Sequence, residues 1–253
     1  MATSTLARRS GAAVTGAAVA AALTLLTPVP AHAQVATQFA AQGSASADYT
    51  GASPTGTCDV TVPDADEVTS GIATFSRGTK HRSMDLDATF ASSDNPADTV
   101  RVRAHSGADL TIKKKNRDLK AFDLAVGGSV KITHSMANSS CQGQGFAGAI
   151  FQIKFTEHHK GRLFLTRDTT KRHSISEFLL LNADNGKLVT LDLFSGDQSH
   201  ATFRAKLKPG KYIVQFAVAG ISTGTEGIVL KSGAPVSAKI ARTVHLSGLF
   251  KRS

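Results

Sequence analysis

The stretch Leu207–Gly220, LKPGKYIVQFAVAG, decides the fold class of this chain. Behind a Pro-Gly turn, Tyr212, Val214, Phe216 and Val218 alternate with residues that are mostly polar or small. A period of two places alternate side chains on opposite faces of a strand. The pattern therefore predicts a half-buried β-strand.

The same alternation recurs along the chain between turns rich in Gly, Asn, Asp and Pro, and no long segment has a helical period. The other predicted strands are Ser83–Phe90, Thr99–Ala104, Ala121–Val126, Ser129–Met136, Phe151–Phe155, Arg162–Leu165 and Leu188–Phe194. Short strands separated by frequent turns are typical of antiparallel β-sandwiches. The sequence therefore predicts an all-β protein with an Ig-like or jelly-roll-like sandwich architecture.

An ordered set of internal matches indicates a duplication. RGTKHRS at Arg77–Ser83 is similar to RDTTKRHS at Arg167–Ser174. Three further matches follow in the same order: Asp94-Asn95 with Asp184-Asn185, Ser106-Gly107 with Ser195-Gly196, and GSVKITHSM with GKYIVQFAV. Repeated units of this kind predict repeated structural modules. We therefore expect two tandem β-sandwich domains, at residues 58–143 and 146–253.

The N-terminus has the features of a secretory signal. An apolar run from Gly11 to Leu26 is followed by small residues at Ala31 and Ala33, which predicts a signal peptide over residues 1–33 that is cleaved after Ala33. The next segment, residues 34–57, is rich in Ala, Ser, Gly and Thr and is predicted to be a flexible leader. The protein is therefore expected to be secreted, with no transmembrane segment in the mature chain.

The chain has two cysteines, Cys58 and Cys141. An even number of cysteines in an exported chain predicts a disulfide bond. In the two-domain interpretation, the bond joins the two ends of the first sandwich. No histidine lies close in sequence to either cysteine, so neither a metal site nor a cofactor is predicted.

The charge balance is basic, with 29 Lys and Arg against 19 Asp and Glu and a net charge of +10. A positive surface favours anionic partners such as cell-envelope polymers, although lysines also keep sheet edges from pairing. Duplex nucleic acid is not expected, because aromatic residues do not alternate with the charges. The chain has no Trp and only two Tyr. Stacking on neutral sugars is therefore disfavoured, and charge-led recognition is expected.

Three basic clusters are the predicted anion-binding sites. Two are the matched basic turns, and the third is the densest run of positive charge in the chain, KKKNR. The predicted residues are Arg77, Lys80, His81 and Arg82 in the first turn, Lys113, Lys114, Lys115 and Arg117 in the run, and Arg167, Lys171, Arg172 and His173 in the second turn.

A family resemblance comes from the second half of the chain. NADNGKLV at Asn182–Val189, followed by AKLKPGKYIVQF at Ala205–Phe216, is similar to the later half of bacterial pre-peptidase C-terminal domains. These are small extracellular β-sandwiches in which an Asn/Asp-Gly turn precedes a strand. The resemblance implies an accessory or binding module of a secreted enzyme.

No catalytic signature is present, since the chain lacks both Gly-x-Ser-x-Gly and His-Glu-x-x-His. We therefore predict a secreted, non-catalytic binding or envelope-associated protein. One alternative is a hydrolase with an unrecognised site, which a Ser or Asp beside His158, His159 or His200 would favour. Another is a protein-interaction or inhibitor module, which would need an exposed apolar patch.

Overall fold

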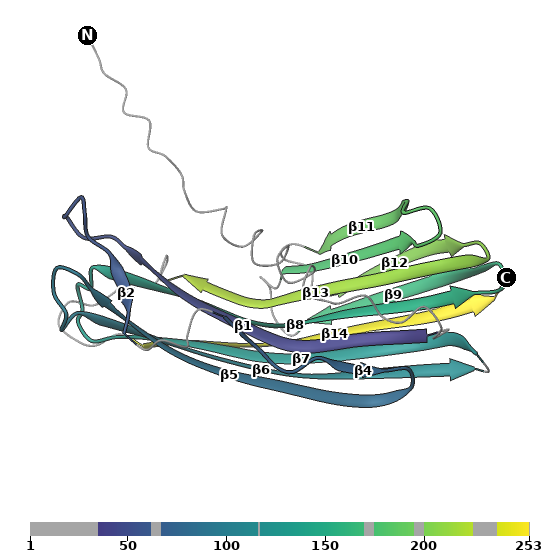
Figure 1. Ribbon diagram of the computed structural model, residues 1–253, viewed down its shortest axis with the longest axis horizontal. Helices are drawn as coiled ribbons and strands as arrows, with labels where there is room; N and C mark the ends of the chain where they lie inside the picture. The colour runs from purple at the N-terminus through teal and green to yellow at the C-terminus, as the bar shows by residue number, and fades with distance from the viewer. Residues whose placement is uncertain are drawn as a thin grey trace, which may run out of the picture.

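The computed structural model describes residues 35–61, 67–115, 117–169, 175–194, 200–224 and 237–252. Within these ranges the chain forms an elongated antiparallel β-sandwich without helices (Figure 1). The predicted all-β sandwich class is confirmed.

Each of the two sheets has seven strands. Sheet A has the order β11-β10-β13-β8-β1-β3, and β4 also pairs with β1. Its strands are β1 (Val35–Tyr49), β3 (Glu67–Thr69), β4 (Ala73–Phe75), β8 (Cys141–Glu157), β10 (Ile175–Asn182), β11 (Leu188–Phe194) and β13 (Gly210–Gly224). Sheet B has the order β12-β9-β14-β7-β6-β5-β2. Its strands are β2 (Cys58–Val60), β5 (Gly78–Ser92), β6 (Thr99–Lys115), β7 (Asp118–His134), β9 (Gly161–Thr169), β12 (His200–Leu207) and β14 (Ser237–Arg252).

The predicted division into two tandem domains is wrong. Each sheet contains strands from both predicted domains, and the predicted boundary at residues 144–145 lies inside β8. In sheet B, β7 pairs with β14 from Thr133 opposite Ser237 to Ala121 opposite Leu249. In sheet A, β8 pairs with β1 on one side and with β13 on the other. The two halves of the chain therefore complete each other's sheets.

Several strands are also longer than predicted. The predicted strands at 121–126 and 129–136 are parts of one strand, β7, which continues through Gly127 and Gly128. Both glycines lie in the ladder with β6, opposite Gly107 and Ser106. The glycine pair is therefore part of a sheet and not a turn.

The predicted flexible leader is wrong as well, because most of it is the inner strand β1. This strand pairs with β8 along its whole length, from Val35 opposite Phe155 to Tyr49 opposite Cys141. Phe39 is fully buried, and so are the small residues next to it. Small residues such as Ala, Ser and Gly are typical of linkers, but in β1 their small side chains allow the two sheets to pack closely. The predicted signal peptide, residues 1–33, lies outside the described residues, so export stays a prediction.

Two clusters of buried apolar side chains lie along the sandwich. Between them, the buried Ser106 hydroxyl donates a hydrogen bond of 2.6 Å to the Gly148 carbonyl, from sheet B to sheet A. Glycines in β8 allow close packing of the sheets. A Cβ atom at Gly145 would lie 2.5 Å from Val130 Cγ1 and 2.8 Å from Val102 Cγ1.

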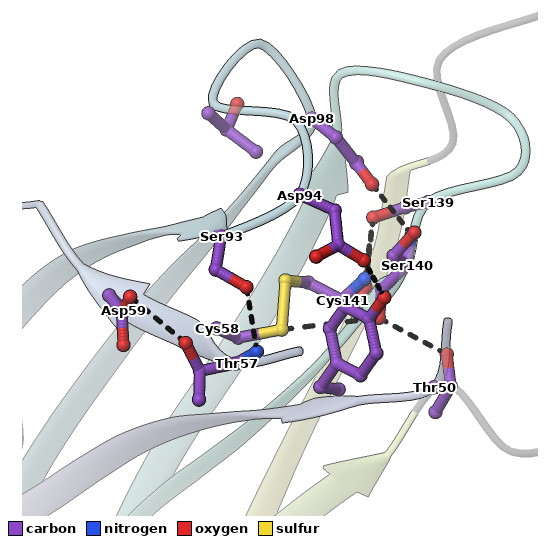
Figure 2. The surroundings of a disulfide bond; sticks show 12 residues. Thr50, Thr57, Cys58, Asp59, Ser93, Asp94, Asp98, Ser139, Ser140 and Cys141 are labelled. Carbon is purple, nitrogen blue, oxygen red and sulfur yellow. Dashed lines mark hydrogen bonds between the residues drawn. A yellow bond between two sulfur atoms is a disulfide. The ribbon is translucent and has the colours of Figure 1, made fainter. Parts of the chain in front are cut away.

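The predicted disulfide bond is confirmed and joins Cys58 to Cys141, with a Cα–Cα distance of 5.9 Å (Figure 2). Because β2 belongs to sheet B and β8 to sheet A, the bond connects the two sheets. It does not close a separate first domain, as the sequence predicted. Hydrogen bonds fix the surrounding loops, including one of 2.6 Å from the Ser140 amide to Asp98 Oδ2.

Candidate anion-binding surface

The outer face of sheet B carries three cations opposite one another on adjacent strands. Along β9, Leu163 and Leu165 are buried in the core, so Arg162 points outward and is exposed. Lys206 on β12 lies opposite Arg162 on one side, and Lys251 on β14 lies opposite it on the other. We call these three residues the cationic row. Adjacent strands are about 4.8 Å apart, and like charges directly opposite one another destabilise a sheet.

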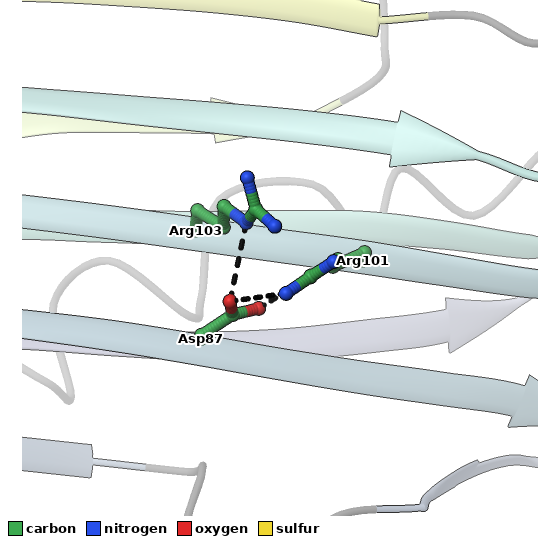
Figure 3. A network of polar contacts seen from close by, with 3 residues as sticks. All are labelled: Asp87, Arg101 and Arg103. Carbon is green, nitrogen blue, oxygen red and sulfur yellow. Dashed lines mark hydrogen bonds and ion pairs between the residues drawn. The ribbon is translucent and has the colours of Figure 1, made fainter.

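No ion pair neutralises the cationic row within the described part of the chain. The other end of the same face shows the opposite arrangement. There Asp87 accepts hydrogen bonds of 2.6 and 2.5 Å from Arg101 and one of 3.1 Å from Arg103 (Figure 3). The hydrogen bonds from Arg101 hold the pKa of the Asp87 carboxyl below its usual value. The cationic row therefore keeps its positive charge available to a ligand.

Phe164, the next outward residue on β9, lies between two cations. The Arg204 guanidinium carbon is 5.5 Å from the ring centroid, and Lys251 Nζ is 5.2 Å from it. These residues belong to β12 and β14, which flank β9 on opposite sides. Cation–π contacts of this kind hold a cation over a ring. Phe164 is thus already in contact with cations on both sides, which makes it a poor platform for stacking a sugar or a base.

A pocket of about 220 Å³ adjoins the cationic row. It shares Arg162 and Lys251 with the row, and its lining includes Arg252, the last residue of β14. Half of its lining residues are basic, and the lining consists of Lys115, Asp118, Leu119, Lys120, Glu157, Gly161, Arg162, Phe250, Lys251 and Arg252.

The acidic residues of this pocket are already engaged. Asp118 Oδ1 is 2.7 Å from His158 Nδ1, and Asp118 Oδ2 is 2.6 Å from Arg252 Nη2. Burial alone would raise the pKa of the Asp118 carboxyl, but the hydrogen bonds from His158 and Arg252 outweigh it and lower the pKa. Glu157 is buried and accepts a hydrogen bond of 3.2 Å from the His159 amide. The pocket therefore extends the positive surface of the cationic row.

Two of the three predicted basic clusters lie together at this end of sheet B. Gly78, which follows Arg77, lies opposite Ile112, so the first basic turn is next to the KKKNR run. Lys113 lies opposite Ala121, which lies opposite Leu249 beside Phe164. The exposed predicted residues in these clusters are Arg77, Lys80, His81, Lys113, Lys115 and Arg117, while Arg82 and Lys114 are half-buried.

Some of these cations have partners. Arg82 donates a hydrogen bond of 2.6 Å from Nε to the Gly71 carbonyl, and His81 Nδ1 is 2.9 Å from Asp109 Oδ1. Lys115 lines the pocket described above. Lys115 and Lys113 are therefore the predicted residues closest to the candidate surface.

The third predicted cluster does not form an exposed site through Arg167, and this prediction is wrong for that residue. Arg167 is 1% exposed, because it occupies an inward position on β9, in phase with Leu163 and Leu165. Lys171, Arg172 and His173 lie outside the described residues. The cationic row could not be predicted from sequence, because its three members are far apart along the chain and meet only through strand pairing.

The alternative functions, a hydrolase and a protein-interaction module, stay predictions. His158 lies 2.7 Å from Asp118, and His200 Nδ1 lies 2.6 Å from Asp168 Oδ1. Among the described residues, however, no hydroxyl or thiol is hydrogen-bonded to either ring, so neither pair has a nucleophile in place. A protein-interaction module would need an exposed apolar patch. Among the described residues, the exposed large apolar side chains come from separate segments of the chain: Val60, Ile72, Met136, Leu188, Val189 and Leu249.

Nor do the described ranges contain three or more His, Cys, Asp or Glu side chains grouped so as to hold a metal ion. In the part of the chain that the structure covers, no helix has the length and apolar character needed to cross a membrane.

Comparisons with known proteins identify no family. No protein-family model matches the chain, and no curated protein sequence matches it. The resemblance to pre-peptidase C-terminal domains therefore stays a prediction.

Similar solved structures include the carbohydrate-binding module TmCBM61 in complex with beta-1,4-galactotriose, at 8% identity and a TM-score of 0.24, covering 68% of this chain and 88% of that one. Infectious bursal disease virus of the Gx strain follows at 12% identity and a TM-score of 0.22, covering 90% of this chain and 54% of that one. The secreted serine protease VesC from Vibrio cholerae has 10% identity and a TM-score of 0.22, with 84% of this chain and 46% of that chain covered. Similarities this low carry no argument about function.

Proposed function

We propose that this protein is a secreted, non-catalytic binding protein that holds an anionic polysaccharide of the cell envelope on the outer face of sheet B. The observation that carries the proposal is the cationic row, in which Lys206, Arg162 and Lys251 lie side by side without an acidic partner among the described residues. Repulsion between adjacent cations is relieved when an anionic ligand lies across them. A row across strands suits an extended polymer that carries a negative charge on each unit.

The surroundings of the row support charge-led binding over stacking. Arg204 and Lys251 approach the ring of Phe164 from the strands on either side. The adjoining pocket contributes further cations, including Lys115 and Lys120. We therefore expect the affinity to depend on the charge of the polymer and to fall steeply as salt rises, because exposed charges are screened over about 8 Å at physiological ionic strength.

The test compares two substitutions of the same type on the same face. Lys251→Glu reverses a charge of the cationic row. Lys131→Glu, the control, reverses an exposed lysine on β7 that lies ten residues along the strand from Ala121, or roughly 33 Å at about 3.3 Å per residue. The probe is a short sulfated oligosaccharide, and binding is measured by isothermal titration calorimetry.

Loss of one charge contact and gain of a repulsive one costs on the order of 1 to 2 kcal/mol, so Lys251→Glu should weaken binding by about tenfold. Lys131→Glu should leave the dissociation constant within about twofold of the unsubstituted protein, since its charge lies several Debye lengths away. Equal losses in the two variants would show that only net charge matters, and the proposed site would then be wrong.

The hydrolase alternative makes a different prediction. It assigns catalysis to His158 and Asp118, of which Asp118 lines the pocket, so His158→Gln would abolish cleavage of an anionic substrate. The binding function predicts no cleavage by the unsubstituted protein. Incubation of the same oligosaccharide with the protein, followed by mass spectrometry, distinguishes the two.

A further inference from the structure

Histidine–aspartate contacts lie on the same outer face of sheet B, beyond the cationic row. His200 Nδ1 on β12 is 2.6 Å from Asp168 Oδ1 on β9, and His245 on β14 lies opposite the same aspartate. On the other side of the face, His81 Nδ1 on β5 is 2.9 Å from Asp109 Oδ1 on β6. These contacts join residues on adjacent strands, as the members of the cationic row do.

A further pair lies four residues along the same two strands, where His105 Nδ1 is 2.8 Å from Asp85 Oδ1. All seven side chains are exposed and alternate with buried residues, so they point to the face that carries the cationic row. Asp168 is six residues along β9 from Arg162, or roughly 20 Å. We call this set the histidine belt: His81, Asp85, His105, Asp109, Asp168, His200 and His245.

The histidine belt contains four histidines and three aspartates, so its net charge depends on pH. With neutral imidazoles the charge is 0 − 3, or −3, and with protonated imidazoles it is 4 − 3, or +1. Histidine is the side chain whose charge ordinarily changes between pH 5 and 8. The charged described residues on this face within two positions of the belt, or of the residues opposite it, are Asp87, Arg103, Asp123 and Lys131.

Among these neighbours, Arg103 lies in the ion-paired group with Asp87 and Arg101. The remaining described positions that lie opposite the belt histidines, Ala125 and Ser129, are uncharged. The change in charge on acidification therefore comes from the histidines themselves.

We infer that the histidine belt makes polymer binding on this face pH-dependent: at neutral pH it confines an anionic polymer to the cationic row, and on acidification it becomes positive and extends the binding surface along the strands, from the row to the belt. This inference rests on the proposed function and adds its regulation. The row and the belt both run across the strands, so a negative belt repels the part of a polymer that leaves the row and runs along the strands. Once the imidazoles are protonated, the same part of the polymer meets cations.

The experiment compares a short sulfated oligosaccharide, sized to the cationic row, with one long enough to reach the histidine belt. Sulfate stays ionised at both pH 7.5 and pH 5.5, so only the protein changes charge. The affinity of the long probe should rise at least tenfold from pH 7.5 to pH 5.5, while that of the short probe changes by less than about threefold. The dependence of the long probe's affinity on salt should also steepen, because more charge contacts release more counterions.

Two sets of substitutions test the cause. The quadruple variant H81Q/H105Q/H200Q/H245Q should lose the pH response of the long probe, whereas His159→Gln, an exposed histidine in the turn after β8, should keep it. The double variant D109N/D168N should act in the opposite direction and tighten binding of the long probe at pH 7.5. Urea unfolding followed by circular dichroism checks that each variant is folded.

The outcomes separate this inference from the proposed function. If the long probe keeps its pH response in the quadruple variant while Lys251→Glu still weakens the short probe at pH 7.5, the histidine belt is not the cause and only this inference is overturned. If neither probe binds at either pH, both proposals are overturned. A D109N/D168N variant that binds the long probe no better at pH 7.5 also overturns the role of the belt.

Discussion

Replacement of Arg162 by glutamine should have opposite effects on stability and on binding. Arg162 is the middle charge of the cationic row, with Lys206 and Lys251 opposite it on the two neighbouring strands. Its loss removes two repulsive contacts from the free protein and one attractive contact from the complex. Arg162→Gln should therefore raise the free energy of unfolding and lower the affinity for a sulfated oligosaccharide.

The size of the stability gain follows from the spacing of the strands. Side chains on strands about 4.8 Å apart can splay their charges to roughly 7 Å, where two unit charges in water repel by about 0.6 kcal/mol. Two such contacts give a gain on the order of 1 kcal/mol at low ionic strength. The gain should nearly vanish at 1 M salt, where the Debye length falls to about 3 Å.

Urea unfolding at about 0.01 M and 1 M NaCl measures this difference. Circular dichroism is the appropriate signal, because the chain has no tryptophan. Lys211→Gln is the control, since Lys211 is exposed on β13 and lies opposite the uncharged Thr156. A variant that is no more stable at low salt, or whose gain persists at 1 M salt, would contradict the argument from repulsion.

Three further predictions concern the sandwich itself. Replacing Cys58 and Cys141 together by alanine should lower the free energy of unfolding by up to about 4 to 5 kcal/mol, because the disulfide closes a loop with a sequence separation of 83. Urea unfolding of the two proteins under oxidising conditions measures this difference. Gly145→Ala should lower the free energy of unfolding by about 1 to 3 kcal/mol, because the added Cβ would lie 2.5 Å from Val130 Cγ1. The control is Gly71→Ala, where the added atom meets nothing within 4 Å. Equal melting temperatures for the two variants would disprove the close packing of the sheets. Burial lowers the pKa of His134 in the folded protein. As the pH falls below about 6.5, His134 of the unfolded chain is protonated first, so the free energy of unfolding should decrease from there down to the folded-state pKa. His134→Leu should flatten this part of the plot of stability against pH.

Local patterns were sufficient for the strands in which apolar and polar residues alternate, and the presence of two cysteines was sufficient for the disulfide. Tyr212, Val214 and Phe216 are buried, as their alternation predicted. The hairpin between β10 and β11 turns through Gly186 at a φ of 66°, in agreement with the Asn-Gly turn expected there. Such features depend on neighbours in sequence, so a single chain reveals them.

Pairing between distant strands could not be predicted in the same way. Val35–Tyr49 has the composition of a linker, yet it is an inner strand, because small side chains fit where the two sheets are close. The repeated segments suggested two domains, but β7 and β13 lie in different sheets of one sandwich. Alternation of apolar and polar residues is found in any half-buried strand and does not specify which strand it pairs with.

The sequence by itself determined the fold class, the basic charge and the disulfide, because each follows from residue types and short-range periodicity. Only the tertiary structure decided that Lys206, Arg162 and Lys251 lie side by side and that Arg167 faces the core. The physical reason is that strand register, set by burial of the apolar faces across the whole sandwich, brings distant residues together on one face.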